Sequence, residues 1–292
     1  MTKGSDVETA TVGVVGCGLM GSGIAEVFAR SGRTVLVHET SAEAAARGRQ
    51  RVESSFRRAV GAGKLAAKAA DEALGRISVG TDLTALAPVD LCIEAVHEDE
   101  GLKTALFAEL DRVIESESAV LASNTSSVPI MKLGTATNRP EQVIGMHFFN
   151  PVPVLPLVEL VPSLLTSLEI EARVRGLAEE LGKTVIRSQD RAGFVVNALL
   201  VPYLLSAIRM YESGFATAED IDVGMVEGCA HPMGPLHLTD LIGLDTTMAV
   251  AQSLYEEFKE PLYAAPPLLQ RMVDAGLLGR KTGRGFYTYT SG

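Results

Sequence analysis

The stretch "TVGVVGCGLMGSGIAEVFARSGRTVLVHE", residues 11–39, decides the fold. A short apolar run leads into a glycine-rich turn, and a helical pattern and a second apolar run ending at Glu39 follow. Apolar runs of this kind are typical of parallel strands that are buried on both faces. The stretch therefore predicts one strand–helix–strand unit of a parallel sheet.

The turn in this unit carries glycines at Gly16, Gly18 and Gly21, in the pattern G-x-G-x-x-G. The first glycine permits the tight turn, the second lets the backbone approach a pyrophosphate, and the third lets the helix pack closely on the strand. Glu39 stands where a carboxylate accepts both hydroxyls of an adenosine ribose and repels a 2′-phosphate. The pattern predicts an NAD site. NADP remains an alternative because Arg33 lies near in sequence, and FAD, which uses the same loop, is a less favoured one. The non-functional alternative is a plain glycine turn with a solvated glutamate.

The remainder of the chain predicts two domains of different class. Further strand-like runs lie at residues 90–96, 119–124, 143–148, 156–161 and 183–188, and a long helical insertion fills residues 41–77. After about residue 190 the pattern is helical, over residues 194–213, from an N-cap at Thr217 onward, and over 239–258 and 266–276. We expect an α/β fold with a Rossmann-type doubly wound sheet over residues 1–190, followed by an all-α domain over residues 191–292.

The composition narrows the class of partner. A net charge of −10 over 292 residues argues against nucleic acid or an anionic membrane as the main partner. The three cysteines, Cys17, Cys92 and Cys229, have neither a disulfide framework nor zinc-ligand spacing, so we expect reduced, mostly buried thiols. The polar N-terminus lacks a signal-peptide core, and the apolar run 194–208 is too short to span a bilayer. These features favour a cytoplasmic protein.

Polar side chains follow two of the predicted strands, at the edge where doubly wound sheets bind ligands. Glu98 and Lys103 could reach the ribose of the cofactor, although pairing of Lys103 with Glu100 on a helix surface is an equally open reading. In "LASNTSSVPI", residues 121–130, Asn124 and Ser126 could hold ligand, whereas simple helix capping is the alternative. No G-x-S-x-G pattern surrounds these serines, so a serine nucleophile is not expected.

The stretch "GMHFFNPVPVLPLVEL", residues 145–160, places His147 and Glu159 in an otherwise apolar run. Buried polar side chains need partners, so we expect these two to pair. A histidine at a nicotinamide site can remove an alcohol proton, and a carboxylate on its other nitrogen fixes the tautomer. A purely structural histidine is the alternative. The other histidines show no metal-ligand spacing, so no metal is expected.

Two features of the helical part have plainer readings. Asn197 lies within an apolar run, where its amide needs a partner that helix capping or an interface could supply. The run "GLLGRKTGRGFY", residues 276–287, is expected to be a surface turn anchored by Phe286 and Tyr287.

Taken in order, these motifs resemble the L-3-hydroxyacyl-CoA dehydrogenases, and most closely the bacterial short-chain 3-hydroxybutyryl-CoA dehydrogenases. The resemblance covers nearly the whole chain and includes "HPMGPLHLTDLIGLDT" at residues 231–246. It implies an NAD-binding domain followed by a helical domain that binds substrate and forms a homodimer, with an acyl-CoA as substrate.

The resemblance also implies roles for particular residues. His147 would be the general base, Glu159 its orienting partner, and Ser126 and Asn197 would contact the substrate near its reacting carbon. The substrate set is completed by Asn150, Ser55 and Lys64. The family's NAD-binding positions match Gly16, Gly18, Leu19, Met20, Gly21, Glu39, Ala95, Val96, Glu98, Lys103 and Asn124.

The chain departs from the family pattern in the insertion. Ala62 stands where many members carry a lysine that contacts CoA, so Arg57, Arg58, Lys64 or Lys68 are the candidates for the CoA phosphates. The predicted reaction is the reversible NAD-dependent oxidation of (S)-3-hydroxybutyryl-CoA to acetoacetyl-CoA. Two alternatives are a dehydrogenase of a small polar hydroxy acid, such as carnitine or gulonate, and a non-catalytic NAD-binding structural protein.

Overall fold

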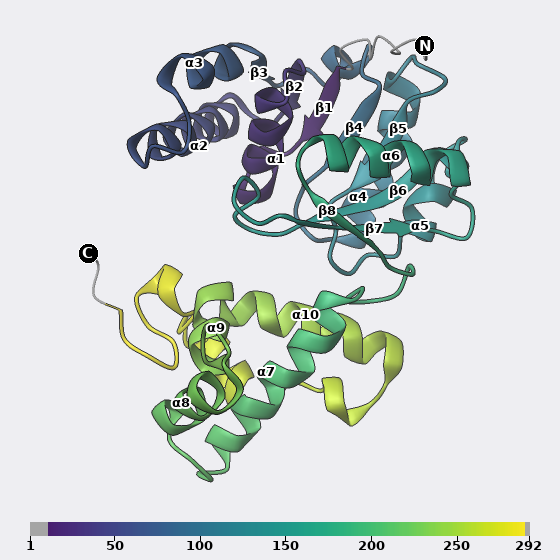
Figure 1. Ribbon diagram of the computed structural model, residues 1–292. Helices are drawn as coiled ribbons and strands as arrows, with labels where there is room; N and C mark the ends of the chain where they lie inside the picture. Colours follow the sequence, from purple (N-terminus) through teal and green to yellow (C-terminus); the bar gives the residue numbers. More distant parts are fainter. Residues whose placement is uncertain (1–10, 290–292) are drawn as a thin grey trace, which may run out of the picture. The chain divides into compact units, whose positions relative to one another are not determined.

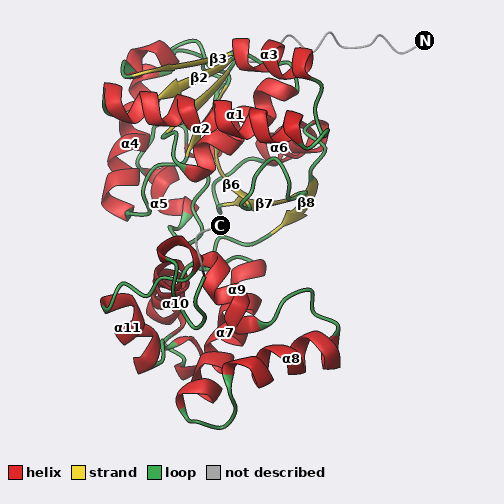
Figure 2. Cartoon of the chain, turned by 90° about the vertical axis from the view of Figure 1, so that its left-hand side faces the viewer, coloured by secondary structure: helices red, strands yellow, loops and turns green. Residues whose placement is uncertain are grey.

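The computed structural model describes residues 11–289, and the chain divides into two compact units between Asp190 and Arg191. The first unit contains a sheet with helices on both faces, and the second is helical (Figures 1 and 2). Within the described residues, none of the helices combines the length and apolar character needed to cross a membrane.

The sheet of the first unit has eight strands in the order β3-β2-β1-β4-β5-β6-β7-β8. All neighbouring pairs are parallel except β6 and β7, which are antiparallel. The order reverses at β1, so the crevice beyond the carboxyl ends of β1 and β4 is the switch point where such sheets bind ligands. The strands are β1 (Val12–Val15), β2 (Val35–His38), β3 (Ile77–Gly80), β4 (Leu91–Glu94), β5 (Val120–Ser123), β6 (Val143–Phe148), β7 (Leu157–Pro162) and β8 (Thr184–Arg187).

Seven of these strands coincide with the predicted runs, and the doubly wound fold is confirmed. The prediction missed β3, because residues 41–77 were read as helical up to Ile77. This strand has four residues, "ISVG", and only its first is fully buried. An edge strand that contributes so little apolar surface leaves almost no periodic signal in the sequence.

Helices cover both faces of this sheet. Helices α1 and α6 pack on one face, where Ile24 and Phe28 join Val174 in the main hydrophobic core, and α4 and α5 lie on the other (Figure 1). The predicted insertion is a pair of helices, and the first begins at an N-cap in which Ser41 Oγ accepts from the Ala44 amide. The helices are α1 (Leu19–Arg30), α2 (Ala42–Gly61), α3 (Ala67–Gly75), α4 (Glu100–Val113), α5 (Ile130–Thr135) and α6 (Leu168–Glu180).

The second unit is helical, as predicted, and Thr217 caps its second helix by accepting a hydrogen bond from the Asp220 amide at 3.1 Å. The predicted helix over residues 239–258 is in fact two helices. Gly243 separates them with φ of +103°, a conformation that favours glycine. The helices are α7 (Val196–Glu212), α8 (Ala218–Cys229), α9 (Pro235–Ile242), α10 (Leu244–Phe258) and α11 (Pro267–Asp274).

The turn after α11 is anchored by a buried carboxylate as well as by its aromatic residues. Asp240 is 1% exposed and accepts from the amides of Phe286 and Tyr287, each at 2.9 Å, and from the hydroxyl of Tyr289 at 2.9 Å. All three cysteines are free thiols, and Cys17 and Cys92 are buried whereas Cys229 is exposed, which agrees with the expectation of mostly buried thiols.

Candidate active site at the carboxyl edge of the sheet

The glycine loop lies between β1 and α1, as its pattern predicted. Gly16 has φ of +90°, and its amide donates to the His38 carbonyl at 2.9 Å. A Cβ atom on Gly21 would lie 1.8 Å from the Gly16 carbonyl oxygen, so α1 starts in close contact with the strand end. A Cβ atom on Gly18 would meet no protein atom within 4 Å. The loop therefore has the tight turn, the close packing and the open backbone that a bound pyrophosphate requires.

Glu39 lies beside this loop, directly after β2. Its Oε1 accepts a hydrogen bond from the Cys17 amide at 2.5 Å, which places the carboxylate where an adenosine ribose would bind. Arg33, which had kept NADP open, precedes β2 and lies at the opposite end of that strand. It is 6% exposed, forms an ion pair with Glu180, and donates to Ser31 Oγ at 2.8 Å. The geometry therefore favours NAD, because the nearby carboxylate would repel a 2′-phosphate and Arg33 is engaged elsewhere.

The thiol of Cys17, inside the glycine loop, is unreactive near neutral pH. Burial, and after it the charge of Glu39, raises the pKa of Cys17 to about 11. Since the thiolate is the reactive form, Cys17 is protonated and unreactive near neutral pH.

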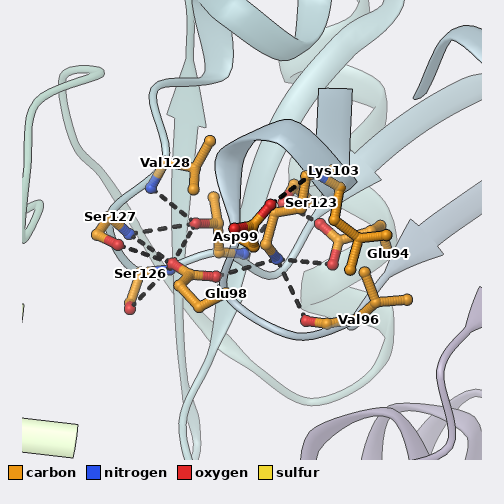
Figure 3. Close-up of polar contacts among 11 residues, drawn as sticks. Glu94, Val96, Glu98, Asp99, Lys103, Ser123, Ser126, Ser127 and Val128 are labelled. Atoms are coloured by element: carbon orange, nitrogen blue, oxygen red, sulfur yellow. Dashed lines mark hydrogen bonds and ion pairs between the residues drawn. The ribbon is translucent and has the colours of Figure 1, made fainter. Parts of the chain in front are cut away.

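Glu98 and Lys103 meet at the carboxyl end of β4, as Figure 3 shows. The ammonium of Lys103 lies 3.0 Å from Glu98 Oε2 and is 1% exposed. Pairing of Lys103 with Glu100 is therefore wrong, and Glu100 instead pairs with Lys132 at 2.8 Å. Burial acts to raise the pKa of Glu98, but the Lys103 charge and the Thr125 hydroxyl outweigh it and lower this pKa to about 2.

The loop after β5 is tied to both neighbouring strands. Asn124 donates its amide to the Glu94 carbonyl at 2.8 Å and accepts from the Phe148 amide at 2.9 Å through its side chain. Ser126 donates its amide to Glu98 Oε1 at 2.9 Å. Capping of this turn is performed by Thr125, whose hydroxyl accepts from the Val128 amide at 2.8 Å. The Ser126 hydroxyl does not cap this turn and instead donates to Glu98 Oε1 at 3.4 Å.

His147 and Glu159 form the predicted pair. They are directly opposite each other in the antiparallel register of β6 and β7, and Nδ1 of His147 lies 2.7 Å from Oε2 of Glu159. The carboxylate is fully buried, and His147 is 7% exposed. A carboxylate on Nδ1 holds the proton there, so the neutral imidazole presents Nε2 as its basic nitrogen.

Most of the predicted residues thus gather at one edge of the sheet, because β1, β2, β4, β5 and β6 all end there. Ala95 and Val96 follow β4, and Leu19 and Met20 open α1. Asn197 belongs to the second unit, where it is half-buried in the first turn of α7.

A pocket of about 330 Å³ adjoins the start of α1. Predicted substrate residues Ser55 and Asn150 line it, whereas Lys64 does not and is exposed. Its cationic residues are Arg47, Arg51 and Arg58, all on α2. Of the candidates for binding CoA phosphates, only Arg58 lines this pocket. Arg47 and Arg51 were missed, although arginines four and then seven residues apart fall on one face of a helix.

Comparison with known proteins agrees with this geometry. Residues 11–191 match the NAD-binding domain of 3-hydroxyacyl-CoA dehydrogenase, and residues 193–289 match its C-terminal domain. The chain is 60% identical to 3-hydroxybutyryl-CoA dehydrogenase of Mycobacterium tuberculosis over 95% of this chain and 98% of that protein. It is 41% identical to the human mitochondrial hydroxyacyl-coenzyme A dehydrogenase, over 95% of this chain and 90% of that one.

Solved structures of 3-hydroxyacyl-CoA dehydrogenases have the same fold as this chain. The crystal structure of FadB2 from M. tuberculosis matches with a TM-score of 0.95 at 59% identity, covering 97% of this chain and 99% of that one. That of (S)-3-hydroxybutyryl-CoA dehydrogenase PaaH1 from Ralstonia eutropha matches with a TM-score of 0.91 at 44% identity, covering 97% and 100%. The resemblance seen in the motifs is therefore confirmed. The chain belongs to the 3-hydroxyacyl-CoA dehydrogenase family of NAD-dependent oxidoreductases.

Proposed function

We propose that the protein catalyses the reversible oxidation of (S)-3-hydroxybutyryl-CoA to acetoacetyl-CoA with NAD. The observation that carries this proposal is the His147–Glu159 pair, held at 2.7 Å on the sheet edge that also bears the glycine loop. The names of the relatives from M. tuberculosis and R. eutropha support the short acyl chain.

The imidazole of His147 performs the proton transfer. In the oxidation, its Nε2 takes the proton of the 3-hydroxyl as the hydride leaves C3, and Glu159 stabilises the imidazolium that forms. In the reduction, the imidazolium returns this proton to the 3-keto oxygen. Bound NAD supplies the hydride acceptor, and NADH the hydride donor. The substrate therefore loses one hydride and one proton in the oxidation, and the charges balance.

The remaining residue roles are part of this proposal. Ser126, Asn150 and Asn197 contact the substrate. The first unit binds NAD, and the second unit binds substrate. The second unit also forms a homodimer, which the exposed apolar side chains of Leu199 and Phe215 support. The protein acts in the cytoplasm. NAD contacts the glycine-loop residues Gly16, Gly18, Leu19, Met20 and Gly21, and also Glu39, Ala95, Val96, Glu98, Lys103 and Asn124.

One assay tests the proposed reaction. NADH oxidation is followed with acetoacetyl-CoA, with longer 3-ketoacyl-CoAs, and with NADPH in place of NADH. The reverse reaction is tried with NAD and free hydroxy acids of the carnitine or gulonate type. We expect acetoacetyl-CoA with NADH to give the highest kcat/KM. Turnover restricted to the free hydroxy acids would support the first alternative, and NADH binding without any turnover would support the structural protein.

The arginine pocket predicts how the CoA moiety binds. We expect Arg58→Glu to raise the KM for acetoacetyl-CoA by about tenfold, because a charge-assisted bond to phosphate is replaced by repulsion. The KM for acetoacetyl-pantetheine, which lacks the nucleotide phosphates, should stay within about twofold, since no phosphate contact is lost.

Arg57→Glu is the matched control for this change. Arg57 is the adjacent residue on α2, is exposed, does not line the pocket, and donates to Ser54 Oγ at 2.8 Å. Equal effects of the two variants, or equal effects on both substrates, would show that CoA phosphates do not bind in this pocket.

A further inference from the structure

A second carboxylate, Glu94, lies on the side of the Lys103 ammonium opposite to Glu98 (Figure 3). Glu94 is the last residue of β4 and is fully buried. Its Oε1 accepts from the Lys103 ammonium at 2.6 Å, and its Oε2 accepts from the Ser123 hydroxyl at 2.6 Å. Lys103 is thus held between two carboxylates, and Glu94 connects α4 to the ends of β4 and β5.

The two carboxylates differ in how they are supported. Besides Lys103, Glu98 accepts from several groups of the loop after β5, among them the amides of Ser126 and Ser127, and its side chain is 34% exposed. Within the described residues, the carboxylate of Glu94 accepts hydrogen bonds from the Lys103 ammonium and the Ser123 hydroxyl alone. Burial raises the pKa of Glu94, against the opposing effect of Lys103, so Glu94 is the carboxylate that takes a proton first.

We propose that Glu94 is a positioning residue of the cofactor site. The ionised Glu94 accepts from the Lys103 ammonium at 2.6 Å and so fixes Lys103 at the point where it also pairs with Glu98 at 3.0 Å. Lys103 and Glu98 thereby keep the positions from which they contact the ribose of the cofactor. This inference rests on the proposed function, which assigns Glu98 and Lys103 to NAD. Glu94 itself acts only through Lys103, because it has no exposed surface.

Protonation of Glu94 removes one of the two negative charges that hold the Lys103 ammonium, so Lys103 and its partner Glu98 are less firmly placed for the ribose. The groups that act on the charge of Glu94 are Lys103 on α4, Glu98 in the loop after β4 and the Ser123 hydroxyl on β5. The neighbouring Cys92 thiol on β4 is uncharged, because burial and the charge of Glu94 raise its pKa. Val15, its partner in the register with β1, is uncharged. The affinity for NADH should therefore be highest where Glu94 is ionised and fall as the pH drops through its raised pKa.

The test is the Glu94→Gln variant, which removes the charge and keeps the size of the side chain. We expect its Kd for NADH, measured by fluorescence titration, and its KM for NAD to rise by about tenfold, the loss expected for one charged hydrogen bond. The kcat at saturating cofactor and the KM for acetoacetyl-CoA should stay within about twofold of wild type. The variant should also lack the acid-side loss of NADH affinity that wild type shows.

Glu100→Gln is the matched control, because Glu100 also pairs with a lysine but on the exposed side of α4. It should bind NADH as wild type does. An unchanged Kd in Glu94→Gln, or a fall in kcat with an unchanged KM for NAD, would overturn the proposal.

Ser123→Ala is a second variant that tests the proposal if Glu94→Gln fails to fold. Loss of the hydroxyl removes a hydrogen bond that lowers the pKa of Glu94. The pH midpoint of NADH affinity should therefore move upward, with the affinity at high pH unchanged; an unmoved midpoint would contradict the proposal. Wild-type protein that binds no NADH would instead show that the proposed function is wrong, so the two failures are distinguishable.

Discussion

Replacement of His147 by glutamine should lower kcat by a factor of about 10²–10⁴, the usual contribution of general acid–base catalysis. Glutamine can still donate a hydrogen bond to Glu159, but it cannot take up the proton of the 3-hydroxyl. The Kd for NADH should stay close to that of wild type, because His147 belongs to β6 and not to the glycine loop. Steady-state turnover of acetoacetyl-CoA and a fluorescence titration with NADH measure the two effects separately.

His231→Gln provides the control for loss of an imidazole. His231 lies in the second unit, where its Nδ1 is 3.2 Å from the Tyr203 hydroxyl. Its replacement should leave kcat unchanged. Near-normal turnover in His147→Gln would return His147 to a structural role and remove the central support of the proposed reaction.

The second large effect is expected from Gly21→Ala. Its Cβ atom would lie 1.8 Å from the Gly16 carbonyl oxygen and 2.9 Å from the carbonyl carbon, and backbone atoms cannot move aside as a flexible side chain can. The glycine loop must open, so we expect the Kd for NADH to rise by more than about 100-fold and the free energy of unfolding to fall by about 1–3 kcal/mol, as overpacking commonly costs.

Gly18→Ala separates the two effects of that change. Its Cβ atom meets no protein atom within 4 Å, and the φ of −68° at this position suits any residue. Stability in urea should therefore match wild type, whereas the affinity for NADH should fall, because the methyl group occupies space that the pyrophosphate needs. Tight NADH binding by Gly21→Ala would show that the cofactor does not use this loop.

The sequence predicted the parts of the site that carry local signals. Glycine spacing, a carboxylate at a strand end and a lone histidine in an apolar run are each visible within a few residues. The partner of Lys103 was not visible in the sequence, because tertiary packing decides whether a lysine on a helix pairs with a helix neighbour or with a distant strand. Glu94, the buried partner, did leave a signal as the one charged residue between Leu91 and Val96.

The missed elements depend on tertiary structure in the same way. Strand β3 is defined by its pairing with β2, and its own four residues carry almost no pattern. The division between α9 and α10 depends on one backbone angle at Gly243 inside a continuous apolar pattern. The arginine pocket depends on the packing of α2 beside α1, which the helical pattern of α2 alone does not specify.

The antiparallel pairing of β6 and β7 also bears on how the enzyme could be re-engineered. His147 and Glu159 face each other through the ladder itself, and residues 149–156 form the connection between the two strands. Exposed residues of this connection, such as Val154, can therefore be exchanged without changing which residues pair, as long as the ladder keeps its register and Val152 stays in the core. Asn150 and its neighbours line the arginine pocket, so libraries built in this loop offer a route to new acyl-carrier preferences on an unchanged proton-transfer pair.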